Sequence, residues 1–191
     1  MYSFKDWCVD NHQEQMLTEF INGQNDILPN QISYGSTQKV HWKCSLGHCW
    51  QSSPNNRTNH KNSCPICGNK KVLVGFNDLA TTNPELAAEW DFKKNKPLMP
   101  TDIVAKSNKN VWWVCEKGHS YKQKISVRTC QHTGCPICAG LKVLPGYNDL
   151  MTTHPILALE WDYDKNDGKT PNDVIAGSHM KAAWRCSKNH T

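Results

Sequence analysis

The 191-residue sequence lacks long apolar runs and has few hydrophobic side chains. Hydrophobic residues make up 38% of the chain, and the mean hydropathy is −0.68. No run approaches the roughly 20 apolar residues of a membrane-spanning helix, and the first residues do not form a signal peptide. These absences predict a soluble, cytoplasmic chain that has no membrane partner. They also argue against one large hydrophobic core.

Cysteine and histidine, in contrast, are abundant, at ten and nine residues. In two places a C-x3-H pair is followed, after a hairpin-length segment, by a C-P-I-C pair. Such pairs suit a tetrahedral zinc ion, because each pair spans one edge of the tetrahedron. Disulfides are the alternative for so many cysteines, but they do not explain the paired histidines. The sequence therefore predicts two complete zinc sites, with the ligands Cys44, His48, Cys64 and Cys67 in one and Cys115, His119, Cys135 and Cys138 in the other.

The two ligand sets belong to an internal repeat with a constant sequence period of 71, as in the series Cys44, Cys115 and Cys186. The sequence motifs GFNDL and AAEWD recur as GYNDL and ALEWD. A fixed period of this kind indicates one supersecondary unit used repeatedly. A third copy supplies only Cys186 and His190, half of a tetrahedron. We expect either a partner protein or a C-terminal continuation of the chain to complete that site.

The predicted fold class is small zinc-stabilised α+β, in tandem treble-clef or zinc-ribbon repeats joined by short helical connectors. Structural zinc contributes on the order of 10 kcal/mol per site, which replaces a core that so short a segment cannot build. The predicted segments are a degenerate helical half-repeat (1–28), a first finger (29–71), a connector (72–100), a second finger (101–142), a connector (143–171) and an incomplete third finger (172–191).

Within the first finger, we expect a strand ending near Cys44, a tight knuckle, and a return strand from Cys49 to Ser53. Pro54 should end that strand because proline cannot donate to the ladder. The C-P-I-C pair should begin a helical turn. A knuckle, hairpin and short helix together describe a treble clef, with a plain zinc ribbon as the alternative. Three further cysteines are excluded from the sites: Cys8, expected to be buried and apolar, and Cys49 and Cys130, which do not recur.

The connectors contain a helix start at Asn83, where a capping side chain precedes Pro84. Leu86 and Trp90 lie four residues apart on one face, which should pack on a finger. His154 occupies the equivalent of Asn83, so we interpret it as structural rather than as a ligand.

These motifs, in the order NDL, EWD, W-x-C-x3-H and CPIC, resemble the bacterial and viral zinc-ribbon repeats that are classed as treble clefs of unknown function. The resemblance covers nearly the whole chain. It implies a shared role for one arginine (Arg57, Arg128) and one tryptophan (Trp42, Trp113, Trp184) per repeat. Such repeats accompany endonuclease domains, which implies targeting to nucleic acid. The first repeat departs by having Phe20 in place of tryptophan, and the third by lacking its second ligand pair.

Positive charge gathers on the fingers. Six basic residues and no acids lie between Lys39 and Lys71, and seven basic residues and one acid lie between Lys106 and Lys142. Three thiolates and one Zn²⁺ sum to −1, so two sites lower the formal charge of +5 to +3. Local clustering permits phosphate binding, of DNA in preference to RNA. The predicted contacts are Lys43, Arg57, Lys61, Lys70, Lys71, Lys122, Lys124, Arg128 and Lys142.

Several of these features have a structural alternative. The knuckle tryptophans shield the ligands or stack on bases, whereas Trp112 faces the opposite side of its strand from Trp113 and should be exposed. The two arginines either bind phosphate or orient the C-P-I-C turn. A protein-interaction scaffold is the alternative function. An enzyme is not expected, because four protein ligands leave no open position on the metal.

Overall fold

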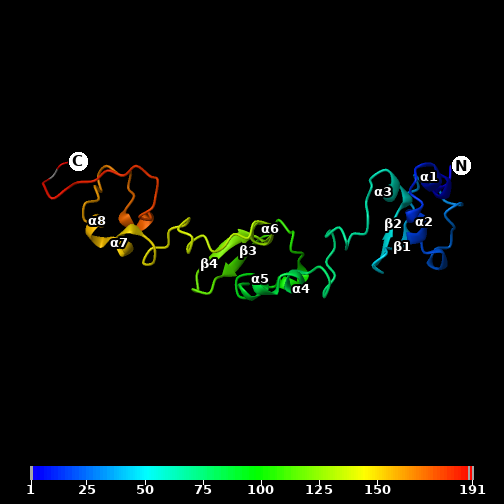
Figure 1. Ribbon diagram of the computed structural model, residues 1–191, viewed down its shortest axis with the longest axis horizontal. Coiled ribbons are helices and arrows are strands. Elements are labelled where there is room, and N and C mark those ends of the chain that lie inside the picture. The colour runs from blue at the N-terminus through cyan, green and yellow to red at the C-terminus, as the bar shows by residue number, and fades with distance from the viewer. Residues whose placement is uncertain (1, 189, 191) are drawn as a thin grey trace. The chain divides into compact units, whose positions relative to one another are not determined.

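The computed structural model describes residues 2–188 and 190 (Figure 1). The chain forms two compact units, one of residues 1–82 with 100–105 and one of residues 83–99 with 106–191. No helix in the described ranges combines the length and the apolar character that crossing a membrane requires. Each unit is built of short elements around small cores.

The first unit holds one antiparallel hairpin and several short helices (Figure 1). The hairpin pairs β1 (Val40–Lys43) with β2 (Cys49–Ser52), in a register from Val40 opposite Ser52 to Lys43 opposite Cys49. The return strand ends before Pro54, as predicted, and that proline begins a helix. The helices are α1 (Phe4–Asp10), α2 (Gln15–Glu19), α3 (Pro54–Thr58) and α4 (Leu79–Thr82).

The N-terminal segment completes the first core. The side chain of Ser3 accepts a hydrogen bond from the Asp6 N–H and the Asp6 carboxylate accepts one from the Ser3 N–H, so both partners satisfy amides at the start of α1. Cys8 on this helix is buried, as predicted. The buried residues of the core are Phe4, Cys8, Phe20, Ile32, Val40 and Trp42.

The second unit contains the second hairpin, β3 (Asn110–Val114) with β4 (Ser120–Lys124), in a register from Asn110 opposite Lys124 to Val114 opposite Ser120. Helix α5 begins at Pro84 as predicted, but the Asn83 side chain makes no capping hydrogen bond. The helices are α5 (Pro84–Ala88), α6 (Ile125–Cys130), α7 (Leu150–Thr153) and α8 (Pro155–Ala158).

One aromatic contact recurs in all three repeats. An aromatic residue one to three positions after each connector helix packs edge to face on the tryptophan of the next C-x3-H strand. The ring centroids are 5.4, 5.6 and 5.3 Å apart in Phe20–Trp42, Trp90–Trp113 and Trp161–Trp184. Each connector helix therefore packs on the finger that follows it in the chain.

An asparagine ties each connector to the same strand. The Asn95 amide donates to the carbonyl of Trp112 and accepts from its N–H, both at 2.8 Å, so the side chain imitates a neighbouring strand. Asn25 and Asn166 make the same pair of bonds with His41 and Ala183. These asparagines fix where each connector joins its hairpin. Short 3-10 helices lie at Asn22–Gln24, Pro100–Asp102 and Pro171–Asp173.

Candidate metal centre

The first ligand pair of each finger lies on a tight backbone knuckle between the two strands. The Cys44 N–H donates to the carbonyl of His48 at 3.0 Å, and the Gly47 N–H donates to the carbonyl of Cys44 at 2.9 Å. Gly47 has a φ of 83°, in the left-handed region that favours glycine. This turn brings the cysteine and the histidine to the same side of the hairpin end. Cys115, Gly118 and His119 repeat the arrangement, with bonds of 3.1 and 2.7 Å.

The second ligand pair lies on the C-P-I-C turn. The Gly68 N–H donates to the carbonyl of Cys64 at 2.9 Å, and the Lys70 N–H donates to that of Pro65 at 2.8 Å. The segment is a hydrogen-bonded turn and not an α-helix, so the predicted helical character is limited to one turn. The helices that precede it, α3 and α6, were not anticipated from the sequence.

The four donor atoms of each set converge at distances that fit zinc. Zn–S and Zn–N bonds of about 2.3 and 2.0 Å place tetrahedral ligand atoms about 3.8 Å (S···S) and about 3.6 Å (S···N) apart. In the first set, Cys44 Sγ lies 3.8 Å from Cys67 Sγ and 3.5 Å from His48 Nδ1. In the second, Cys115 Sγ lies 3.9 Å from Cys138 Sγ and 3.5 Å from His119 Nδ1. The two tetrads are zinc sites.

The knuckle backbone lowers the pKa of one cysteine in each ligand set. Burial opposes ionisation of the Cys44 thiol, but hydrogen bonds from the backbone of His48 and Leu46 hold its pKa below the ordinary value. The pKa of Cys115 is lowered in the same way. Before metal binds, burial and the neighbouring cysteines raise the pKa values of Cys67 and Cys138. Zinc binding therefore displaces protons from the ligand set.

The NDL motif that follows each finger supports the second ligand turn. The Asn77 amide donates to the carbonyls of Ile66 and Lys71 at 2.9 and 3.0 Å and accepts from the Leu73 N–H at 2.7 Å. Asn148 makes the equivalent three bonds at 3.0, 3.0 and 2.7 Å. The motif therefore holds the backbone that presents the C-x-x-C thiols.

The aromatic residue of the same motif covers the histidine ligand. The rings of Phe76 and His48 meet edge to face with centroids 4.4 Å apart. Tyr147 and His119 repeat the contact at 4.2 Å. Nδ1 of each histidine faces the sulfur atoms, so the aromatic ring helps to fix the orientation of the imidazole.

The repeated arginine is buried beside each site and forms an ion pair. Arg128 donates to Glu89 through Nη1 at 2.9 Å and through Nη2 at 2.8 Å, and it also contacts the Tyr121 hydroxyl. Arg57 pairs with Glu19 through Nη2. Each arginine is 4% exposed. The sequence left open whether these arginines contact phosphate or orient the C-P-I-C turn. The structure places both in buried ion pairs with the connector helix, which leaves little of either guanidinium accessible to a phosphate.

The seven lysines predicted as nucleic-acid contacts are all exposed: Lys43, Lys61, Lys70, Lys71, Lys122, Lys124 and Lys142. Most of them do not recur at the repeat spacing. Lys122 and Lys124 correspond to Gln51 and Ser53 in the first finger, and only Lys71 corresponds to another lysine, Lys142. The positive surface is therefore not a repeated stripe, whereas the zinc ligands, the arginines and the asparagines recur.

The other sequence predictions concern aromatic and cysteine side chains. Trp42 and Trp113 are buried, which confirms packing for these two, whereas Trp184 is half-buried. Trp112 is half-buried rather than exposed, because Lys94 lies 4.2 Å from its ring centroid. Among the described residues, neither Cys49 nor Cys130 joins a metal-ligating group.

The third repeat forms only the knuckle half of a site. The Cys186 N–H donates to the carbonyl of His190 at 3.0 Å, as in the two complete knuckles. Within residues 2–188 and 190, this pair belongs to no group of three or more ligands.

Comparison with family models supports the assignment of the two tetrads as zinc sites. A model described as "Probable Treble clef zinc finger domain" matches residues 16–70, 86–141 and 157–191. The chain belongs to this treble-clef family. Each match includes part of the connector that precedes its finger, in agreement with the Trp90–Trp113 contact. Comparison with curated proteins gave no match.

Two sets of supporting residues were missed from the sequence. Glu19 and Glu89, and the asparagines Asn25 and Asn95, are separated by almost the same interval as the zinc ligands, and Glu160 and Asn166 continue both series. The near-constant spacing was available as a signal, but an acid or an amide at such a position could not be distinguished from a solvated side chain.

Proposed function

We propose that this chain is a non-catalytic zinc-finger module that binds nucleic acid, DNA in preference to RNA, through surface lysines. The association of similar repeats with endonuclease domains fits a targeting role within a larger nuclease or mobile-element protein. The zinc ions act structurally in this proposal, because each tetrad supplies four protein ligands and leaves no open position for a substrate.

The outer face of the second hairpin carries the proposal. Lys122 lies opposite Trp112 in the β3–β4 register, and Lys124 lies two residues further along the same face. The Nζ atom of Lys94 lies over the Trp112 ring and donates to the Ser120 hydroxyl at 2.7 Å. We call Lys94, Lys122 and Lys124 the hairpin lysines. All three are exposed.

Negative charge is sparse around the hairpin lysines. Neither β3 nor β4 contains an acidic residue. Asp91, the acid that contacts Ser120, is buried, and hydrogen bonds from the backbone of Lys93 and Lys94 and from the Ser120 side chain lower its pKa. Three cations on one face can bind the phosphate backbone of a nucleic acid. Such contacts position the protein on the nucleic acid but do not read its base sequence.

Salt dependence tests the proposal. Replacing the three hairpin lysines by alanine should weaken binding of mixed-sequence duplex DNA, and should reduce the slope of log K against log salt by about three units. Zinc content should stay at two ions per chain, because none of these side chains is a ligand.

A charge-matched control separates a local face from net charge. Lys5, Lys181 and Lys188 are exposed and lie outside the second finger, so their replacement removes the same charge. The control should retain most of the affinity. Equal losses in both variants, or no binding by the zinc-loaded wild type at low salt, would refute the proposed face.

A protein-interaction scaffold is the second candidate, and exposed apolar side chains favour it. Val74, Leu46 and Leu141 are 64%, 64% and 83% exposed. A scaffold would keep its partner through moderate salt and lose it when such side chains are truncated. The salt titration therefore distinguishes the two functions.

A further inference from the structure

The outer face of the second hairpin carries a tryptophan that the fold does not require. Trp112 lies on β3 opposite Lys122 and is half-buried. The same position holds His41 in the first repeat and Ala183 in the third, and the backbone of each makes the same pair of bonds with an asparagine. The connector therefore fixes the backbone at this position, while a side chain as small as a methyl group is accommodated there.

The indole of Trp112 also differs from the packed indoles of the fingers. The indole N–H groups of Trp42 and Trp113 donate to backbone carbonyls of the paired strand at 2.9 and 3.1 Å, and both rings are buried. Among the residues that the structure describes, the indole N–H of Trp112 donates to no such carbonyl. A half-exposed aromatic ring with an unbonded polar edge is typical of a binding surface.

Lysines surround this ring. Lys94 Nζ lies 4.2 Å from the centroid of the Trp112 ring and donates to the Ser120 hydroxyl at 2.7 Å. Lys122 lies directly across the hairpin from the ring, and Lys124 lies on the diagonal. Because the ammonium of an exposed side chain reaches the ring, a flat ligand from solvent can reach it as well.

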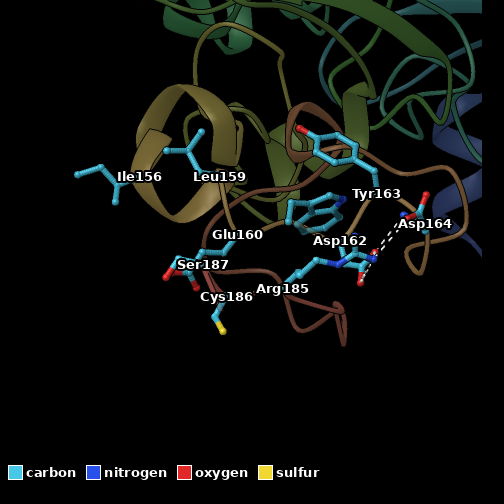
Figure 2. Close-up of a pocket in the computed structure, with 10 residues that line it drawn as sticks. Ile156, Leu159, Glu160, Asp162, Tyr163, Asp164, Arg185, Cys186 and Ser187 are labelled. Atoms are coloured by element: carbon cyan, nitrogen blue, oxygen red, sulfur yellow. Dashed lines mark hydrogen bonds and ion pairs between the residues drawn. The ribbon is translucent and has the colours of Figure 1, made fainter. Parts of the chain in front are cut away.

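The other two repeats have different chemistry at this place. In the first finger, His41 lies opposite Gln51, and their side chains bond at 2.9 Å. In the third repeat, Arg185 pairs with the carboxylates of Asp162 and Asp164 (Figure 2). An aromatic ring surrounded by lysines is therefore a feature of the second finger.

We infer that Trp112 and the hairpin lysines form a site for single-stranded DNA, in which an unpaired base stacks on the indole and the neighbouring phosphates contact the lysines. This inference rests on the proposed function, because it names the form of nucleic acid that the same face prefers. The bases of a duplex stack on one another, whereas a single strand exposes base faces to an aromatic side chain. Base stacking outweighs an exposed cation–π contact, so a base displaces Lys94 from the ring and leaves its ammonium to contact phosphate.

Three DNA ligands test the inference. The zinc-loaded chain is titrated with a short mixed-sequence single strand, with the same strand in a duplex, and with an abasic strand of equal length that retains the phosphates. We expect Trp112→Ala to weaken binding of the single strand about tenfold. The duplex and the abasic strand should bind the variant and the wild type equally, because neither offers an unpaired base.

A conservative variant gives a second measurement. Trp112→Phe keeps an aromatic ring and should retain most of the affinity for the single strand. It should lose the quenching of tryptophan fluorescence that a base stacked on the Trp112 indole causes in the wild type. Tyr163→Ala, which removes a 55% exposed aromatic side chain outside the hairpin, is the control and should change neither affinity nor quenching.

The outcomes separate this inference from the proposed function. Trp112→Ala should keep two zinc ions and the wild-type unfolding transition, since Ala183 occupies the same position in the third repeat. The inference is overturned if this variant binds the single strand as tightly as the wild type, or if all three ligands lose affinity by the same factor. In both cases the phosphate contacts of the hairpin lysines would stand. Absence of binding to any DNA at low salt would overturn both proposals.

Discussion

In the first finger, Arg57 donates to Glu19 through one nitrogen, and its guanidinium lies 4.7 Å from the ring centroid of Trp42 and 5.3 Å from that of Trp50. In the second finger, Arg128 makes a bidentate pair with Glu89, and its guanidinium lies 5.0 Å from the ring centroid of Trp113 and 5.7 Å from that of Tyr121, the counterpart of Trp50. The ligand distances are nevertheless nearly the same, for example 3.8 and 3.9 Å between the first and last cysteine sulfurs. The arrangement of the zinc ligands is thus the same in both fingers, whereas the contacts of the neighbouring arginine differ.

This difference separates what the metal requires from what each repeat can vary. Tetrahedral coordination leaves little freedom in the ligand atoms, whereas a buried arginine can be stabilised by carboxylate oxygens or by aromatic faces. The surface lysines vary most of all, since most of them do not recur at the repeat spacing. Perturbing the ligands, the arginines and the supporting asparagines in turn should reveal that order.

The largest expected effect is the loss of one ligand. Cys135→Ala should release zinc from the second finger and unfold it, because an incomplete ligand set forfeits most of a binding free energy on the order of 10 kcal/mol. Elemental analysis should fall from two zinc ions to one. Cys130→Ala, at an exposed cysteine outside the site, is the control and should retain both. Equal zinc content in the two variants would contradict the ligand assignment.

The next largest effect is expected from the loss of one of the two buried arginines. Arg128→Ala should destabilise the second finger by about 3 kcal/mol, because it leaves the Glu89 carboxylate without its bidentate partner. Arg57→Ala should cost less, about 2 kcal/mol, since only one nitrogen donates to Glu19. Denaturant unfolding of each zinc-loaded variant measures both values. A larger loss for Arg57 would mean that Trp50, which stands where the second finger has Tyr121, stabilises the guanidinium more than the second bond to the carboxylate does.

The supporting asparagines should behave alike in both fingers. Asn77→Ala and Asn148→Ala each remove three hydrogen bonds to the backbone around the C-x-x-C turn. We expect each variant to lose about tenfold to 100-fold in zinc affinity, measured by competition with a chelator. Asn59→Ala, which removes an exposed bond to Asn55, should have no effect. Unchanged affinity in both asparagine variants would limit their role to the connector.

The smallest expected difference between the two fingers is in the pH dependence of zinc affinity, which should be the same in both. The bound state holds every cysteine ligand as thiolate, whereas the free site keeps protons on Cys67 and Cys138, whose pKa values are raised. Affinity should therefore rise with pH below those pKa values, by at least about tenfold per pH unit. Chelator competition between pH 6 and pH 8 checks the slope. Zinc affinity that does not change with pH would contradict the protonated free site.

Sequence alone predicted the zinc ligands, the knuckles and the strand limits, because these depend on residues close together in the chain. Pro54 ends β2 through its missing N–H, and the C-x3-H spacing is that of one tight turn. The same reasoning predicted that Trp42 and Trp113 are packed rather than exposed. It could not find Glu89 as the partner of Arg128, since 39 residues separate them.

Only the tertiary structure decided which charged residues are buried. Arg128 and Lys124 look equally basic in the sequence, yet one pairs with a connector helix and the other lies on an outer strand face. Burial depends on how the connector packs on the hairpin, through the Trp90–Trp113 contact and the Asn95 bonds. The repeat period shows that a position recurs. Whether the charged residue at that position is buried in an ion pair or exposed to solvent is decided only when the connector packs on the hairpin.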